Sequence, residues 1–196
     1  MGRALAQSIQ RQMEENDGVR EMNIQKAMIR NCKAQEELPK AAIQFDAAFD
    51  RRNFKSATGL VGWDQKGDLL VLKTVIHNKV SSTFAVEAYA CLESIKLGIS
   101  LRMPSIKIMG DSKAVIKKCQ KNSIDKSMLG AIISDIHNKK SSFQKLNFQY
   151  IHRSENSNAN KLAKSALDRE ENVYLMGVDL DRHVLAWKRR GPRNPD

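Results

Sequence analysis

Along residues 41–50, AAIQFDAAFD, apolar and polar side chains largely alternate, and this alternation constrains the fold more than any other feature of the chain. Successive side chains of an extended chain point to opposite faces of a sheet. One face carries Ile43, Phe45, Ala47 and Phe49. The stretch therefore predicts a strand with one apolar face, and Asp46 lies on the opposite face.

Two more strand-like segments follow closely, GLVGW at 59–63 and LLVLKTVIHN at 69–78. The residues between them, 64–68, are polar and contain a glycine, which is typical of a tight turn. Short turns of this kind join neighbouring strands that run in opposite directions. We therefore expect a meander of three antiparallel strands.

After residue 81 the chain changes to a mixture of helix-like and strand-like segments. Helices are predicted for 82–101, 112–122, 127–140 and 156–170, and strands for 105–111 and 145–152. The serines at 81 and 82 are suited to the N-terminus of the first helix. A strand that returns to the same sheet after a helix runs parallel to the strand before it. The predicted fold class is therefore α/β, with a five-stranded mixed sheet, three antiparallel strands followed by parallel crossovers, flanked by helices.

The length of the chain predicts one globular domain with additional segments at both ends. A chain of 196 residues with 41% hydrophobic residues can build one sizeable core. We expect an N-terminal helical arm at 1–38, a domain at 41–170 and a basic C-terminal tail at 171–196. The last residues, 187–196, are basic and contain proline, and we expect disorder there rather than a nuclear signal.

The charge of the chain indicates a polyanionic partner. The net charge is +11, and residues 41–170 alone carry 21 basic against 12 acidic groups, an excess of nine. The three cysteines show neither a disulfide framework nor metal-ligand spacing, so we expect a reducing, intracellular location, with nucleus and cytoplasm both open. No apolar run is long enough to cross a membrane, and we expect a monomer without a membrane anchor.

Three acidic residues occupy positions that are unfavourable for a carboxylate. Asp46 interrupts a strand, Asp111 ends another, and Glu87 lies on the apolar stripe of a helix. Each could have its own explanation, with Asp46 at a sheet edge, Asp111 capping the next helix and Glu87 paired to a lysine. A shared divalent cation would explain all three together, because it offsets their repulsion and lost hydration. For a site made of oxygen atoms we expect Mg²⁺.

Four segments resemble the successive motifs of one family. QFDAAFD, AVEAYACLESIKLGI, IKIMGDSKAVIKKC and RSENSNANKLAKSAL are similar to those of the type 1 ribonuclease H domain, in the form found as single plant genes and at the end of non-LTR retroelement polyproteins. The resemblance covers about residues 41–168. Integrases, transposases and exonucleases of related fold do not place their second acid on the first helix, so Glu87 favours ribonuclease H.

The resemblance implies a specific activity and site. The family hydrolyses the RNA strand of an RNA/DNA hybrid with two Mg²⁺ ions, for which Mn²⁺ is a possible substitute. By position, Asp46, Glu87 and Asp111 would be the metal-binding carboxylates. The expected reaction is an in-line displacement by water, without a covalent intermediate.

The last motif departs from the family pattern at two places. Asn160 stands where a fourth carboxylate is usual, so we expect it to be a catalytic-site residue that brings no charge and lowers the affinity for one metal. The nearest candidate for the family's mobile loop histidine is His152, which we interpret as an ordinary polar residue at the rim. The alternative function is therefore a catalytically impaired nucleic-acid-binding module derived from a retroelement.

Candidate contacts with nucleic acid are inferred from charge and position. Lys113, Lys117 and Lys118 follow the third carboxylate, and Arg153 and Asn156 open the last motif. The lysines could follow the phosphates of the DNA strand, or they could form only a solvated helix face.

Overall fold

The computed structural model describes residues 41–80, 82–121 and 129–182, which belong to the unit that begins at Pro39. The predicted arm at 1–38 and the predicted disorder at 187–196 lie outside the described residues. None of the helices in the described ranges is both long enough and apolar enough to span a membrane.

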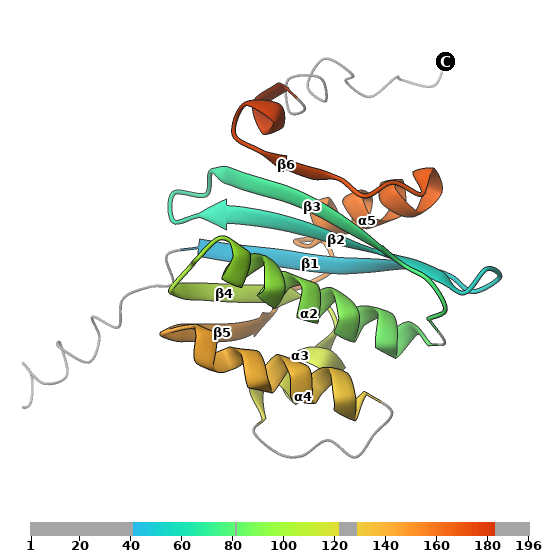
Figure 1. Ribbon diagram of the computed structural model, residues 1–196, viewed down its shortest axis with the longest axis horizontal. Helices are drawn as coiled ribbons and strands as arrows, with labels where there is room; N and C mark the ends of the chain where they lie inside the picture. The colour runs from blue at the N-terminus through green and yellow to red at the C-terminus, as the bar shows by residue number, and fades with distance from the viewer. Residues whose placement is uncertain (1–40, 81, 122–128, 183–196) are drawn as a thin grey trace, which may run out of the picture. The chain divides into compact units, whose positions relative to one another are not determined.

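The described part of the chain forms one mixed sheet of six strands in the order β5-β4-β1-β2-β3-β6 (Figure 1). The strands are β1 (Ala41–Asp50), β2 (Lys55–Asp64), β3 (Leu69–His77), β4 (Ser105–Gly110), β5 (Lys145–Tyr150) and β6 (Tyr174–Met176). The first three pair antiparallel as a meander, and β4 pairs parallel with both β1 and β5. The predicted mixed sheet with antiparallel strands followed by parallel crossovers is therefore confirmed.

The number of strands differs from the five that the sequence predicted. The sixth strand, β6, pairs antiparallel with β3 and lies within 171–196, the stretch expected to be a tail. The side-chain hydroxyl of Thr74 accepts a hydrogen bond from the backbone of Val173 at 2.6 Å, and Leu180 is buried. Three residues are too few to show an alternating pattern, so the pairing depends on the exposed edge of β3 rather than on a local signal.

The helices cover both faces of the sheet. They are α2 (Thr83–Ser100), α3 (Lys113–Gln120), α4 (Gly130–Lys139) and α5 (Ser157–Arg169), with a short 3-10 helix η1 (Lys140–Ser142) after α4. The hydroxyl of Ser82 caps α2 by accepting from the N–H of Ala85 at 3.2 Å, as the sequence predicted for this helix start. Adjacent residues of β2 belong to the cores on opposite faces of the sheet. Leu60 packs with the core under α2, α3 and α4, whereas Val61 packs with α5.

The main core lies between the sheet and the α2, α3 and α4 layer. Ile43 and Phe45 of β1 are both fully buried in it, which confirms the apolar face predicted from the alternation. The opposite face of β1 points toward α5, and Asp46, which is only 3% exposed, lies there. A carboxylate is thus buried in the middle of a central strand.

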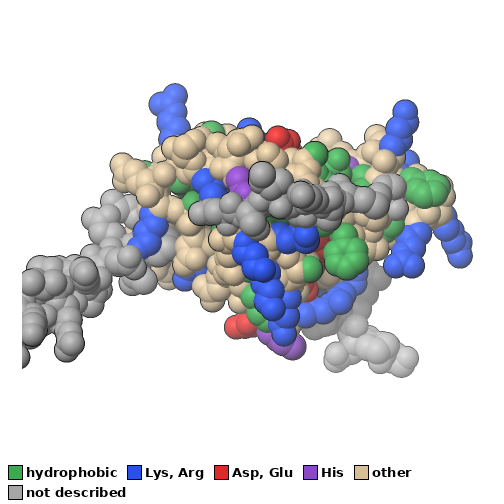
Figure 2. All heavy atoms as spheres, turned by 90° about the horizontal axis from the view of Figure 1, so that it is seen from below, with side chains coloured by type: hydrophobic (Ala, Val, Ile, Leu, Met, Phe, Trp, Pro, Cys, Tyr) green, Lys and Arg blue, Asp and Glu red, His purple; other side chains and the backbone are tan. Residues whose placement is uncertain are grey.

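Lys and Arg are the more prominent charged side chains on the surface seen in Figure 2, which views the molecule from the side where β5, α3 and α4 lie in Figure 1. Lys and Arg are spread over this face, and few acidic side chains are visible. In α3, Lys113 and Lys117 are exposed, and Lys118 is half-buried.

Candidate metal centre

The candidate site lies where two parallel strands part. The pairing of β1 with β4 runs from Ala42 with Lys107 to Gln44 with Met109. Asp46 follows Gln44 by two residues, and Asp111 follows Met109 by two residues. The two aspartates are therefore at the same level on neighbouring strands, just beyond the last paired residues.

Gly110 allows β4 to end close to β1 at this point. A Cβ atom on this residue would lie 2.4 Å from the ring of Phe45, which is fully buried. Because no side chain at 110 would fit beside that ring, the backbone that carries Asp111 can stay near β1. The glycine therefore helps to set the separation of the two aspartates.

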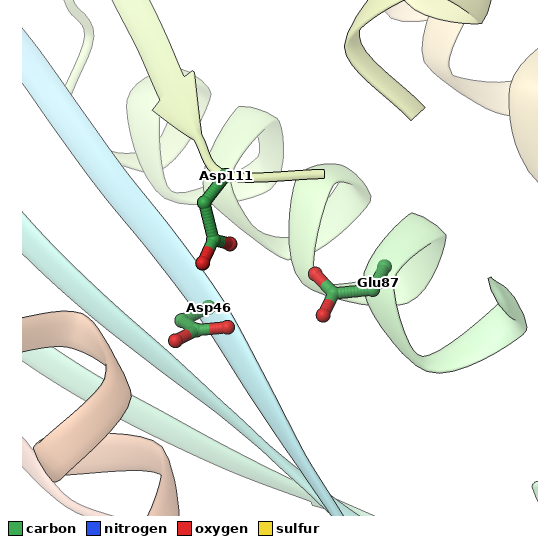
Figure 3. Close-up of side chains that lie close together, drawn as sticks. All are labelled: Asp46, Glu87 and Asp111. Carbon is green, nitrogen blue, oxygen red and sulfur yellow. The ribbon is translucent and has the colours of Figure 1, made fainter. Parts of the chain in front are cut away.

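Glu87 completes the cluster from the neighbouring helix. It lies in the first turns of α2, and Figure 3 shows its carboxylate pointing toward those of Asp46 and Asp111. One oxygen of each of the three residues lies within 4.8 Å of the others. The predicted convergence of three carboxylates from three elements is what the structure shows.

Separate explanations for the three acids do not agree with the structure. Asp46 is on a strand with neighbours on both sides, and the N-cap position of α3 is occupied by Ser112, not Asp111. In the described ranges the lysines that form ion pairs with glutamate do so with Glu93 and Glu170, and none pairs with Glu87.

The electrostatics of the cluster favour a cation. Burial, followed by the charges of Asp46 and Asp111, raises the pKa of Glu87 to about 8. Burial also raises the pKa of Asp46, although the hydrogen bond from Asn160 opposes this. The Oε2 atom of Glu87 is buried without a hydrogen-bond partner among the described residues. Buried acids with an unsatisfied oxygen are the donor set that a hard divalent cation requires.

The cluster opens into a cavity of about 270 Å³, which we call the carboxylate cavity. Arg51, Thr83, Arg153 and Asn160 also line this cavity. The positive charge of Arg153 opposes the rise in the pKa of both Asp46 and Glu87. The three carboxylates thus have both the chemistry and the space to hold a divalent metal ion next to solvent.

Asn160 reaches the cluster from α5. Its Nδ2 donates a hydrogen bond to Oδ2 of Asp46 at 2.6 Å. The close approach of α5 depends on Gly59, the β2 partner of Asp46, because a Cβ there would lie 2.4 Å from the carbonyl oxygen of Ala159. Asn160 was predicted from its family position, but Gly59 was missed, because its only local signal is a glycine inside a strand.

Asn156 holds the two parted strands together. Its side chain is fully buried, and its Nδ2 lies 2.8 Å from the carbonyl oxygen of Phe45 and 3.4 Å from Oδ1 of Asp111. We expected this residue to contact nucleic acid, but a side chain without exposed surface cannot do so in this conformation. Its amide instead links β1 to the end of β4.

The remaining expected residues lie around the site. Arg153 is exposed at the rim of the cavity, and His152 is exposed with its Nδ1 2.9 Å from the hydroxyl of Ser154. His152 does not line the carboxylate cavity, and its interpretation as an ordinary polar residue at the rim stays a prediction. The Nζ of Lys113 lies 4.8 Å from the centre of the Tyr150 ring, in the range of a cation–π contact.

Comparisons with known proteins agree with the geometry. The model of the reverse transcriptase-like family matches residues 44–166. No curated protein sequence matches the chain.

Solved structures with the same fold include several ribonucleases H. RNase H1 from the halophilic archaeon Halobacterium salinarum is 19% identical with a TM-score of 0.61, over 66% of this chain and 98% of that one. The N-terminal RNase H domain of Rv2228c from Mycobacterium tuberculosis has the same identity, 19%, and a TM-score of 0.61, over 67% and 96% of the two chains. LC11-RNase H1 from compost, solved in complex with an RNA/DNA hybrid, is 20% identical with a TM-score of 0.58, over 67% and 99%.

The family model spans more than half of the chain, and its range contains all three carboxylates. The structural neighbours are covered over nearly their full length. The protein therefore belongs to the reverse transcriptase-like family, and its described domain has the fold of a type 1 ribonuclease H domain.

Proposed function

We propose that the protein hydrolyses the RNA strand of RNA/DNA hybrids with Mg²⁺ held by Asp46, Glu87 and Asp111. The convergence of the three carboxylates to within 4.8 Å is the observation on which this proposal depends. The substrate is proposed from the family and from the similar LC11-RNase H1, whose structure contains an RNA/DNA hybrid. The basic surface of the domain supports a polyanionic substrate.

The residues of the site are held in place for this task. Asp46 accepts a hydrogen bond from the N–H of Ala47 at 2.8 Å and another from Asn160. Asp111 is oriented by Asn156, and Glu87 is fixed on a long helix packed on the sheet. Bound Mg²⁺ would supply activation of a water and stabilisation of the departing 3′ oxygen. Carboxylates on such rigid elements need little rearrangement to serve as ligands.

Basic residues near the site would hold the substrate. Arg153 lines the cavity and would contact the phosphate beside the scissile one. Lys113, Lys117 and Lys118 on α3 would contact phosphates of the DNA strand, with a solvated helix face as the alternative role.

A cleavage assay tests the proposal. Purified protein is incubated with an end-labelled RNA/DNA hybrid in Mg²⁺, in Mn²⁺ and in EDTA. We expect cleavage of the RNA strand with either metal, none in EDTA and none by Asp111→Asn. If wild-type protein leaves the hybrid intact at high enzyme concentration with both metals, the proposed catalysis is wrong.

The second candidate function is a nucleic-acid-binding module with an impaired site. The neutral side chain of Asn160 within 2.6 Å of Asp46 is the observation that favours it, because one charge is absent from the metal centre. This function predicts salt-sensitive binding of the hybrid without turnover. Measurable Mg²⁺-dependent turnover by the wild-type protein would exclude it.

A further inference from the structure

A second cavity lies directly beside the metal centre. It has a volume of about 390 Å³ and lies between the hairpin that joins β1 to β2 and the start of α2. Three aromatic residues, Phe49, Phe54 and Phe84, form its walls, and we call it the phenylalanine groove. Phe49, Arg51 and Thr83 line both this groove and the carboxylate cavity, so the two spaces adjoin each other.

Two of the three aromatic rings are unusually exposed. The exposed fraction is 55% for Phe54 and 61% for Phe84. The other large exposed apolar residues of the described ranges, Tyr174, Met176 and Val178, lie together in and after β6. Packing inside the domain therefore does not explain why the groove beside the metal centre carries phenylalanine.

Besides the exposure of its ring, Phe54 has an unfavourable backbone conformation. Its φ angle is +51°, in the left-handed region that glycine and asparagine adopt far more readily than an aromatic residue. The conformation is held by a hydrogen bond from the N–H of Val80 to the carbonyl oxygen of Phe54 at 3.0 Å. A strained residue whose ring is largely in water gains little for folding, and such outliers concentrate at binding sites.

Positive charge lies between the groove and the metal centre. The guanidinium of Arg51 is 3.5 Å from the hydroxyl of Thr83, and Arg52 beside it is exposed. The first N–H groups of α2 have no acceptor within the helix. An apolar groove with aromatic walls next to a guanidinium is suited to bind a nucleotide. The base can stack on an aromatic ring, and the phosphate can pair with the guanidinium.

We propose that the phenylalanine groove stacks an unpaired nucleobase of the strand whose phosphate lies at the metal centre. The inference rests on the proposed function for the position of that phosphate. A base within a duplex has both faces covered by its neighbours, so a ring can stack on it only if it is unpaired. The groove would therefore select hybrids that carry a single-stranded extension or an unpaired base next to the phosphate at the metal centre.

Binding of two kinds of hybrid tests the proposal. Fluorescence anisotropy of the full-length protein is measured in Ca²⁺ with a blunt hybrid and with hybrids that carry a short extension at each possible end. We expect at least one extended hybrid to bind about 5- to 150-fold more tightly than the blunt one, the range for a base stacked on an aromatic ring. Phe54→Asn and Phe84→Ser should remove this preference without changing affinity for the blunt hybrid.

Further variants separate stacking from a structural role. Phe84→Trp keeps an aromatic face and should retain the preference. Phe54→Asn relieves the left-handed strain, so its Tm should equal or exceed that of the wild type while the preference is lost. Tyr174→Ser is the matched control. It removes an aromatic ring of β6 that is 53% exposed and does not line the groove, and it should leave the preference intact.

Several results would overturn the inference. Equal affinity of the wild type for blunt and extended hybrids would do so, as would an equal loss for both in the Phe variants. Self-association that Phe54→Asn abolishes, with unchanged nucleic-acid affinity, would assign the groove to a protein contact instead. Cleavage of the blunt hybrid without a binding preference for extended hybrids would contradict this inference alone. A binding preference for extended hybrids without cleavage of any hybrid would contradict only the proposed catalysis. No binding of any hybrid would remove both.

Discussion

The side-chain amide of Asn160 donates to Oδ2 of Asp46 at 2.6 Å, so a neutral group occupies the place beside the most buried acid of the cluster. This contact is one of the opposing effects that limit the rise in the pKa of Asp46. Asn160 therefore stabilises the ionised form of Asp46 when no metal is bound, and it also orients this oxygen relative to the other two carboxylates.

Replacing Asn160 by aspartate adds a negative charge to the same position. We expect Asn160→Asp to bind Mg²⁺ more tightly and to cleave the hybrid faster, because a fourth carboxylate increases the attraction for the metal. The metal-free variant should be less stable than wild type, since the donor to Asp46 is lost and another buried charge is added. Rates as a function of Mg²⁺ concentration, with thermal unfolding in EDTA, measure both effects; a rate unchanged at every Mg²⁺ concentration would contradict the role of Asn160.

The stability of the metal-free protein should fall as the pH rises. The pKa of Glu87 is about 8 in the folded protein against an ordinary value of 4.5, so the folded state binds more protons than the unfolded chain between these values. Stability that is present at pH 4.5 is therefore lost progressively toward pH 8. Urea unfolding in EDTA at several pH values within this window measures the loss.

Glu87→Gln is the matched control for this dependence. The variant keeps the shape of the side chain but cannot ionise, so it should be more stable than wild type at pH 8 in EDTA and should not cleave the hybrid. Mg²⁺ should raise the stability of the wild type at pH 8 and have little effect on the variant. A wild type whose metal-free stability rises from pH 5 to pH 8 would contradict the account.

Removing the side-chain amide of Asn156 should lower both the stability of the protein and its affinity for metal. Asn156→Ala leaves the carbonyl of Phe45 buried without its donor, which costs about 1–3 kcal/mol. Because Asp111 also loses its partner, Mg²⁺ affinity should fall by about 10- to 100-fold, as for other groups that orient ligands. Asn158→Ala, at an exposed position in α5 two residues later, is the control and should change neither quantity. Equal behaviour of the two variants would show that Asn156 does not hold the site.

The salt dependence of binding should show whether the lysines of α3, rather than those of α5, contact the phosphates of the hybrid. Neutralising Lys113 and Lys117 with glutamine should weaken hybrid binding and reduce the slope of log affinity against log salt by about one for each phosphate that the variant no longer neutralises. The control is the double glutamine variant of Lys161 and Lys164, two exposed lysines of α5. If the Lys113 and Lys117 variant leaves the slope unchanged, α3 is only a solvated face, and an equal decrease in both variants would show that phosphate contact is not specific to α3.

The layered fold and the three carboxylates could be predicted because their signals are local. The alternation in β1 and the cap at Ser82 depend on neighbouring residues, and the structure contains both. The acids stood out because each occupies an element that normally excludes charge. Their convergence followed from the strand and helix order, which brings the ends of β1 and β4 together.

The features that were missed depend on contacts between distant segments. The pairing of β6 with β3 has no periodic signal within three residues. The role of Asn156 requires Phe45, which lies 111 residues earlier, and Gly59 matters only because α5 packs on it. A polar residue before a helix is equally typical of a surface contact, so its burial could not be inferred from its neighbours.

The central claim is that the side chains of Asp46, Glu87 and Asp111 together bind a divalent metal ion, and Mn²⁺ binding measured by electron paramagnetic resonance tests it most directly. Titration of the protein should reduce the signal of unbound Mn²⁺, Mg²⁺ should compete, and Asp111→Asn should weaken binding by at least about tenfold, since even groups that only orient ligands cost this much. Mn²⁺ binding that is equally strong in Asp111→Asn, or absent from the wild type at millimolar metal, would contradict it.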